Sequence, residues 1–195
     1  LNSMEKCFRN HPPAEGERGT EERKKERMAV EQAGIRCDFS GSQLARDPKT
    51  GNFLDVAARV REIYSTNRFM MDFMYINIDE IKCGNCTVSL KIDPERHANH
   101  RRVVHGGVLT ALADAVLGVT GASVGEVVVT ASFSMNFIRN IRMGETARMV
   151  SHVKHHGRTT MVIEGEMYDE ENRLMATMLA TMMNVDKFEG IPAKW

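Results

Sequence analysis

The stretch GGVLTALADAVLGVTGASVG, from Gly106 to Gly125, decides the fold that this sequence predicts. Its apolar residues fall on every face of a helix, which is the pattern of a helix covered on all sides. Strand-like segments lie before and after it, and they predict a sheet that curls around the helix. We therefore expect an α+β domain in which a curved antiparallel sheet wraps around one long central helix, preceded by an N-terminal extension.

The strands are predicted from runs of β-branched and apolar residues that lie between turn-forming residues. Residues 73–82 and 87–92 form an expected hairpin, because Gly84 and Asn85 supply the positive φ of a tight turn. Four further strands are expected after the helix, at 127–138, 146–155, 159–168 and 174–185. Their short connections make neighbouring strands antiparallel. Apolar residues at three- and four-residue spacing predict a short helix between Phe53 and Tyr64, with Arg59 facing outward.

Composition separates this domain from the residues before it. Residues 1–52 contain 14 hydrophobic and 19 charged positions, so we expect a charged extension that is partly helical or disordered. The domain is expected to span 53–186, followed by a tail at 187–195. The whole chain carries 26 basic and 26 acidic side chains, and this balance argues against a polybasic nucleic-acid binder.

The cysteines indicate a compartment and argue against a metal site. Four cysteines in 195 residues are too few for a disulfide framework, which favours a reducing, cytoplasmic location. Cys83 and Cys86 have the spacing of a metal knuckle, but zinc needs four ligands and no second pair accompanies them. We therefore expect no metal.

Asp114 is the residue in the central helix that points to chemistry. It is the only ionisable residue between Gly106 and Gly125, and its carboxylate argues against a membrane span there. Such a group must be solvated through a cleft, hydrogen-bonded or protonated. A functional carboxylate is therefore favoured over a structural one.

The start of the same helix offers a second chemical group. His105-Gly106-Gly107 forms a turn whose backbone can approach a ligand closely, and unpaired N–H groups at a helix start stabilise an oxyanion. Gly106 and Asp114 are about 12 Å apart along a helix, at 1.5 Å per residue, which is too far for one site within a single chain. An antiparallel two-fold partner would bring Asp114 of one subunit to Gly106 of the other. The site is therefore expected to require a homodimer.

The run from Asn99 to Asp114, NHRRVVHGGVLTALAD, resembles the Asn…His-Gly-Gly…Asp signature of hotdog-fold acyl-CoA thioesterases of the PaaI-like, phenylacetate-degradation type. The six-residue step from Asn99 to His105 and the nine-residue step from His105 to Asp114 match that signature. Residues 130–139 resemble the family's next segment. The resemblance covers about residues 53–186, and it implies a hotdog fold and hydrolysis of an acyl-CoA thioester.

The resemblance also implies roles for individual residues. Asp114 would be the nucleophile or the general base that activates water, and the Gly106 N–H would polarise the thioester carbonyl. Asn99 would position water or the carbonyl from the other subunit, and His105 would orient the loop.

Residues expected to bind substrate lie at the helix start and along the following strand: Gly107, Thr130, Ser132, Arg139 and Arg142. Either Thr130 or Ser132 could hydrogen-bond near Asp114, and the arginines could meet the phosphates of coenzyme A. Coenzyme A enters as part of the substrate, so no separate cofactor is expected. The expected assembly is a homodimer or a dimer of dimers, with no nucleic-acid or membrane partner.

Two other functions are considered. A non-catalytic acyl-CoA-binding hotdog protein, acting as a sensor or regulatory module, would have no need of a lone carboxylate in an apolar helix. A hotdog dehydratase or hydratase is disfavoured, because such sites usually pair the aspartate with a histidine further along the helix and none follows Asp114.

Overall fold

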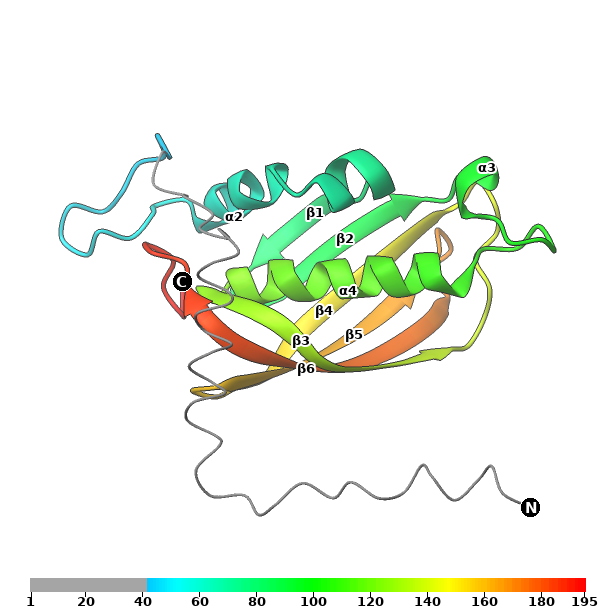
Figure 1. Ribbon diagram of the computed structural model, residues 1–195. Helices are drawn as coiled ribbons and strands as arrows, with labels where there is room; N and C mark the ends of the chain where they lie inside the picture. The colour runs from blue at the N-terminus through cyan, green and yellow to red at the C-terminus, as the bar shows by residue number, and fades with distance from the viewer. Residues whose placement is uncertain (1–41) are drawn as a thin grey trace, which may run out of the picture. The chain divides into compact units, whose positions relative to one another are not determined.

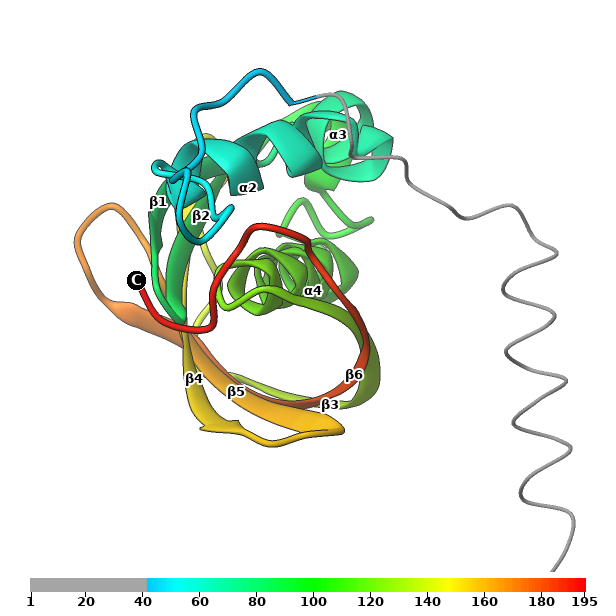
Figure 2. The same cartoon turned by 90° about the vertical axis from the view of Figure 1, so that its left-hand side faces the viewer.

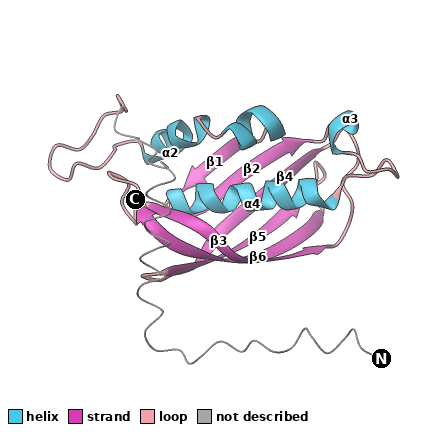
Figure 3. Ribbon diagram, viewed as in Figure 1, coloured by secondary structure: helices cyan, strands magenta, loops and turns pink. Residues whose placement is uncertain are grey.

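The computed structural model describes residues 42–195 (Figure 1). Four helical segments precede or accompany the sheet: α2 (Val56–Ser65), the π-helix η1 (Phe69–Met74), α3 (Pro94–His97) and the long α4 (Gly106–Ala122). The strands are β1 (Asn77–Lys82), β2 (Asn85–Lys91), β3 (Glu126–Phe137), β4 (Thr146–His156), β5 (Thr160–Tyr168) and β6 (Leu174–Lys187) (Figure 3). The charged run at 21–27 lies outside the described residues.

The six strands form a single antiparallel sheet in the order β1-β2-β4-β5-β6-β3. β3 therefore lies at one edge, paired with the last strand of the chain, although it follows α4 directly in sequence. Seen end-on, the sheet curves strongly and α4 lies in its hollow (Figure 2). The predicted architecture, one long helix held by a curved antiparallel sheet, is confirmed.

The core lies between α4 and the concave face of the sheet. On the helix, Leu112, Val116 and Leu117 are completely buried, and they face a sheet surface that is rich in methionine and isoleucine. That surface includes Met149, Met161, Ile163 and Met167. Burying each large apolar side chain stabilises the fold by about 1.5–3 kcal/mol, so this contact fixes the position of α4 against the sheet.

The first hairpin turns where expected, but only Gly84 supplies a positive φ, of +70°, since Asn85 already begins β2. The Gly84 N–H donates to the Ser123 hydroxyl at 3.0 Å, just beyond the end of α4. The turn therefore joins the hairpin to the C-terminal end of the central helix. The helix end is closed further by Trp195, whose Nε1–H donates to the Ser123 carbonyl at 2.7 Å.

One side of α4 is not covered by the residues that the structure describes. This side, here called the open strip, consists of half-buried and exposed residues on one face of the helix: Gly107, Thr110, Ala111, Asp114, Ala115 and Gly118. The sheet of the same chain therefore does not cover α4 on every side. The small side chains of this face leave the helix surface open to close approach.

Two local predictions are corrected. Residues 73–76 were expected in a strand, but η1 extends to Met74 and Tyr75 follows with a φ of +56°. The alternation of exposed Phe73 and Tyr75 with buried Met74 and Ile76 imitates a strand. Arg59 was expected to face outward but is only 5% exposed, because its guanidinium lies over the Phe53 ring and pairs with Glu62.

Contacts at both ends of the described segment tie them to the domain. The Phe53 N–H donates to the Gly190 carbonyl at 2.8 Å, and the Phe53 side chain is buried. The expected division at 52/53 and 186/187 stays a prediction. Among the described residues, the helices are all too short or too polar to cross a membrane.

Candidate functional site

Asp114 lies on the open strip, and one side chain from the sheet orients its carboxylate. The Thr130 hydroxyl on β3 donates a hydrogen bond to Asp114 Oδ1 at 2.9 Å. Asp114 is exposed, so its charged form stays solvated while one oxygen is held. The other carboxylate oxygen is available for a ligand or water.

The sequence left open whether Thr130 or Ser132 faces Asp114, and the structure gives the hydroxyl of Thr130. The register of β3 against β6 shifts here, because Thr130 pairs with Met182 while Ser132 pairs with Thr181. Ala131 is thus an extra residue, a bulge of the kind that re-aims side chains near functional sites. Strict alternation cannot predict such a bulge.

The start of α4 is built as an exposed N-terminal cap. His105 is the capping residue, and its Nδ1 accepts the Gly107 N–H at 2.9 Å, while its carbonyl accepts the Val108 N–H. For the Gly106 N–H, no acceptor is found among residues 42–195. A free donor at the positive end of a 17-residue helix is suited to an oxyanion.

Asn99 shapes the loop that leads into this cap. Its Oδ1 accepts the N–H groups of Arg101 at 2.8 Å and Val103 at 3.3 Å. The loop is closed by a second set of bonds, in which the His105 N–H donates to the His97 carbonyl at 2.9 Å. The side-chain oxygen of Asn99 is therefore engaged within the loop that leads to His105.

A cleft of about 320 Å³ opens at the N-terminal end of α4. Its lining is mostly apolar, with Arg139 and Asn140 as the polar members: Val104, Gly106, Leu109, Phe137, Ile138, Arg139 and Asn140. The Arg139 guanidinium donates to the Leu174 carbonyl at 3.2 Å, which holds it at the cleft. Phe137 and Ile138 were not expected to line the site. Both are apolar residues at the end of a strand, and both are exposed, which is typical of residues beside a ligand cleft.

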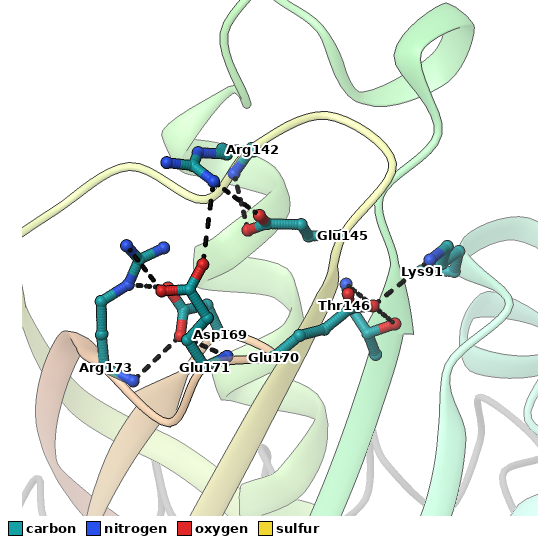
Figure 4. Close-up of polar contacts among 8 residues, drawn as sticks. All are labelled: Lys91, Arg142, Glu145, Thr146, Asp169, Glu170, Glu171 and Arg173. Carbon is teal, nitrogen blue, oxygen red and sulfur yellow. Dashed lines mark hydrogen bonds and ion pairs between the residues drawn. The ribbon is translucent and has the colours of Figure 1, made fainter.

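Arg142 is placed differently from Arg139. Its guanidinium lies 3.6 Å from Glu145 and 3.8 Å from Glu171, in a charged cluster at the turn between β5 and β6 (Figure 4). Arg142 is absent from the residues that line the cleft. Its positive charge is balanced by two carboxylates, so it is less available than Arg139 to a phosphate.

Gly106 and Asp114 lie eight residues apart on one straight helix, about 12 Å along its axis. The two groups therefore do not meet within one chain. Each is open to contact from outside, Gly106 at the cleft and Asp114 on the open strip.

The remaining polar candidates do not gather into a centre. Cys83 and Cys86 are free thiols at the hairpin turn, and burial raises the pKa of Cys86 to about 11, partly offset by Ser123 and Thr120. Within residues 42–195, His, Cys, Asp and Glu side chains form no group of three or more that could hold a metal ion.

The family model described as the thioesterase superfamily matches residues 102–176, a segment that contains His105, Gly106, Asp114 and Thr130. This segment of the chain is therefore similar to the thioesterase superfamily. The resemblance found in the sequence is thereby confirmed, and the hotdog fold with it. The match extends from the loop before α4 into β6.

Solved hotdog structures resemble this chain over most of their own length. The E. coli PaaI protein, from the phenylacetic acid degradation operon, aligns with a TM-score of 0.64 and 20% identity, over 68% of this chain and 95% of that one. A "Hypothetical Thioesterase Protein" from Streptococcus pneumoniae, solved with coenzyme A, aligns with a TM-score of 0.58 and 25% identity, over 60% of this chain and 94% of that one. Two variants of the pneumococcal protein replace an aspartate and a threonine, sixteen positions apart, by alanine.

A comparison of sequences also finds a relative named as an esterase. This chain is 25% identical over 131 residues to a protein of Archaeoglobus fulgidus that bears the name "Putative esterase". The alignment covers 66% of this chain and 83% of that protein.

Proposed function

We propose that this protein is an acyl-CoA thioesterase, which hydrolyses a thioester to a free acid and coenzyme A at a site shared by two subunits. The observation that carries the proposal is the exposed Asp114 carboxylate, held by the Thr130 hydroxyl at 2.9 Å on an otherwise small and apolar helix face. A carboxylate in that setting is positioned for an attack or a proton transfer.

In the proposed dimer, the open strips of two copies face each other in antiparallel orientation. Asp114 of one copy then lies near the Gly106 N–H of the other, which the 12 Å separation along one helix requires. β3 is an edge strand of the sheet, so the two copies can also approach along this strand. The assembly is a homodimer, or a dimer of two such dimers.

The proposed reaction uses backbone and side-chain groups alone. The Gly106 N–H donates to the thioester carbonyl oxygen, and the positive end of the α4 dipole stabilises the charge that develops there. Asp114 either attacks the carbonyl carbon or takes a proton from the water that attacks it. If Asp114 acts as the base, the oxygen of water bonds to the carbonyl carbon, the carbon–sulfur bond breaks, and the proton taken from water passes to the sulfur. If Asp114 attacks, its oxygen bonds to the carbonyl carbon and the carbon–sulfur bond breaks, which leaves a mixed anhydride. Water then hydrolyses the anhydride, which releases the free acid and the Asp114 carboxylate and supplies the proton for the coenzyme A thiol.

Roles for the other residues follow from their contacts. His105 and Asn99 hold the loop and cap that present the Gly106 N–H, and Gly107 leaves room at the cap. Arg139 at the cleft meets a phosphate of coenzyme A, with Arg142 further out at the rim. Ser132 lies two residues after Thr130 on β3.

Two observations from the comparisons support this proposal. The pneumococcal relative has been solved with coenzyme A. The aspartate and threonine replaced in its variants have the same separation as Asp114 and Thr130 here. A non-catalytic acyl-CoA-binding module would use the same cleft, and only hydrolysis separates it from an enzyme.

The deciding experiment measures release of free thiol from a panel of acyl-CoA thioesters. We expect wild-type turnover on at least one thioester and a fall in kcat of at least about a hundredfold for Asp114→Asn, with binding of the thioester retained. Asp186→Asn, at an exposed carboxylate on β6, is the matched control and keeps its activity. Binding of acyl-CoA by both wild type and Asp114→Asn without any turnover would support the binding module instead.

A further inference from the structure

Tyr64 on α2 contacts the same face of α4 that carries Asp114. A Cβ atom at Gly118 would lie 2.5 Å from the Tyr64 hydroxyl and 3.4 Å from the ring carbon that bears it. Only glycine leaves room there, so the phenol points onto the open strip at Gly118. Figure 1 shows α2 and α4 running beside each other on the same side of the sheet.

The hydroxyl of Tyr64 is a hydrogen-bond donor whose acceptor is not found among residues 42–195. Burial raises the pKa of the phenol well above its usual range, and Cys86 and Asp114 add to the shift. The group therefore stays protonated at every physiological pH. Tyr64 is half-buried and its hydroxyl keeps some contact with solvent, so this donor is free to bond to water or to a ligand that supplies an oxygen.

The position of this donor relative to Asp114 is set by the helix. Gly118 follows Asp114 by four residues, so it lies on the same face about 6 Å further along the axis. The open strip is bordered by β3, where Thr130 contacts Asp114, and by α2, where Tyr64 contacts Gly118. An acyl group whose carbonyl carbon lies at Asp114 would reach Tyr64 by extending along this strip.

We propose that Tyr64 determines specificity, by donating a hydrogen bond to a neutral oxygen that the acyl group carries about one helical turn beyond its thioester carbonyl. This inference rests on the proposed function. A carboxylate at that place is disfavoured because the Asp114 charge lies nearby. The substrate class is therefore an acyl-CoA with a hydroxyl or keto oxygen in the middle of its chain, in preference to the plain hydrocarbon.

The test compares three thioesters of equal length: hexanoyl-CoA, 3-hydroxyhexanoyl-CoA and 5-hydroxyhexanoyl-CoA. An extended chain places the oxygen of the 5-hydroxy compound about one helical turn from the thioester carbon, and that of the 3-hydroxy compound about half as far. We expect wild-type kcat/KM to be about tenfold higher for the 5-hydroxy compound than for the other two, mainly through KM. Tyr64→Phe removes this preference, whereas the control Tyr168→Phe, whose hydroxyl contacts Glu166 instead, keeps it.

A second variant checks the geometry. Gly118→Ala places a methyl group against the Tyr64 hydroxyl and lowers activity on all three thioesters, and Tyr64→Phe in the same chain restores part of it. Equal kcat/KM on the three compounds in wild type, or an unchanged preference in Tyr64→Phe, would overturn the role of Tyr64 alone. If wild type hydrolyses none of these three thioesters and none of a wider panel, both the proposed function and this inference are overturned.

Discussion

Thr130 and Asp114 are sixteen residues apart in the sequence and are joined by a hydrogen bond of 2.9 Å from the threonine hydroxyl to Oδ1. The bond links the edge strand β3 to the open strip of α4, and the bulge at Ala131 places the hydroxyl there. Both partners are exposed in a single chain, so the bond contributes little to stability and its value lies in orienting the carboxylate.

The first prediction concerns this bond. Thr130→Val keeps the shape of the side chain and removes the hydroxyl, so Asp114 loses its orienting donor. We expect kcat to fall about tenfold to a hundredfold, because a misaligned catalytic group reacts slowly even when it is present. Thr130→Ser restores the donor and recovers most of the loss. Steady-state hydrolysis of the best thioester measures both, and equal activity of the valine and serine variants would contradict an orienting role.

A second prediction isolates the backbone donor at the start of α4. Gly106→Pro removes the N–H, and proline suits the first position of a helix. His105 already has the extended conformation that a residue before proline requires, with a φ of −67° and a ψ of 129°. We expect kcat to fall about a hundredfold with the folded structure retained.

Gly106→Ala is the matched control for the loss of the N–H. It keeps the donor, and its Cβ would lie 3.6 Å from Phe137, an ordinary contact. It should lose much less activity than the proline variant. Similar losses in the two variants would show that the space at Gly106 matters and its N–H does not.

The two arginines give a third prediction, about binding of the coenzyme A phosphates. Arg139→Gln should raise KM about tenfold, and the effect should shrink as salt rises, because screening weakens the lost attraction in wild type. Arg142→Gln should change KM less, since Glu145 and Glu171 already balance its charge. A larger effect at Arg142 than at Arg139 would contradict the placement of the phosphates.

A fourth prediction follows from His97, which holds the loop before α4. Its Nδ1 accepts the Asp93 N–H at 2.9 Å, and the side chain is buried. Burial lowers the pKa of His97 below its ordinary value of 6.5; Asp93 opposes this shift and Arg96 adds to it. The unfolded chain therefore binds a proton first as the pH falls, so the free energy of unfolding decreases below about pH 6.5 until the pH passes the lower folded pKa.

The variant His97→Asn tests this coupling. Its amide oxygen can accept the Asp93 N–H but does not titrate, so the variant should lose less stability than wild type between pH 7.5 and pH 5.5. Thermal unfolding at the two pH values measures the difference. An identical loss in both proteins would mean that His97 does not contribute to the acid sensitivity.

Much of the fold could be predicted because hydrophobic periodicity determines which residues are buried. The predicted segments at 146–155, 159–168 and 174–185 differ from β4, β5 and β6 by only one or two residues at a boundary. The segment at 73–76 could not be predicted, because its alternating burial is the same in the observed helix end as in a strand. Arg59 could not be placed either, since its burial depends on the Phe53 ring and on Glu62.

The candidate site could be predicted in part for a related reason. The glycines, the histidine and the lone carboxylate stand out in sequence, and the structure brings His105 and Gly106 together at one cap. Whether Thr130 or Ser132 faces Asp114 depended on a one-residue bulge, which leaves no signal in the alternation of the strand. Tyr64 gave no sequence signal beyond its place in an amphipathic helix.

The measurement that tests the central claim most directly uses two variants, Asp114→Asn and Gly106→Pro, each inactive alone. If the site combines Asp114 of one subunit with Gly106 of the other, a mixed dimer contains one intact site and one doubly defective site. Unfolding and refolding an equal mixture of the two should then recover about a quarter of the wild-type activity, since about half of the dimers are mixed and each has one of two sites restored. No recovery from a mixture shown to contain mixed dimers would contradict a site shared between subunits.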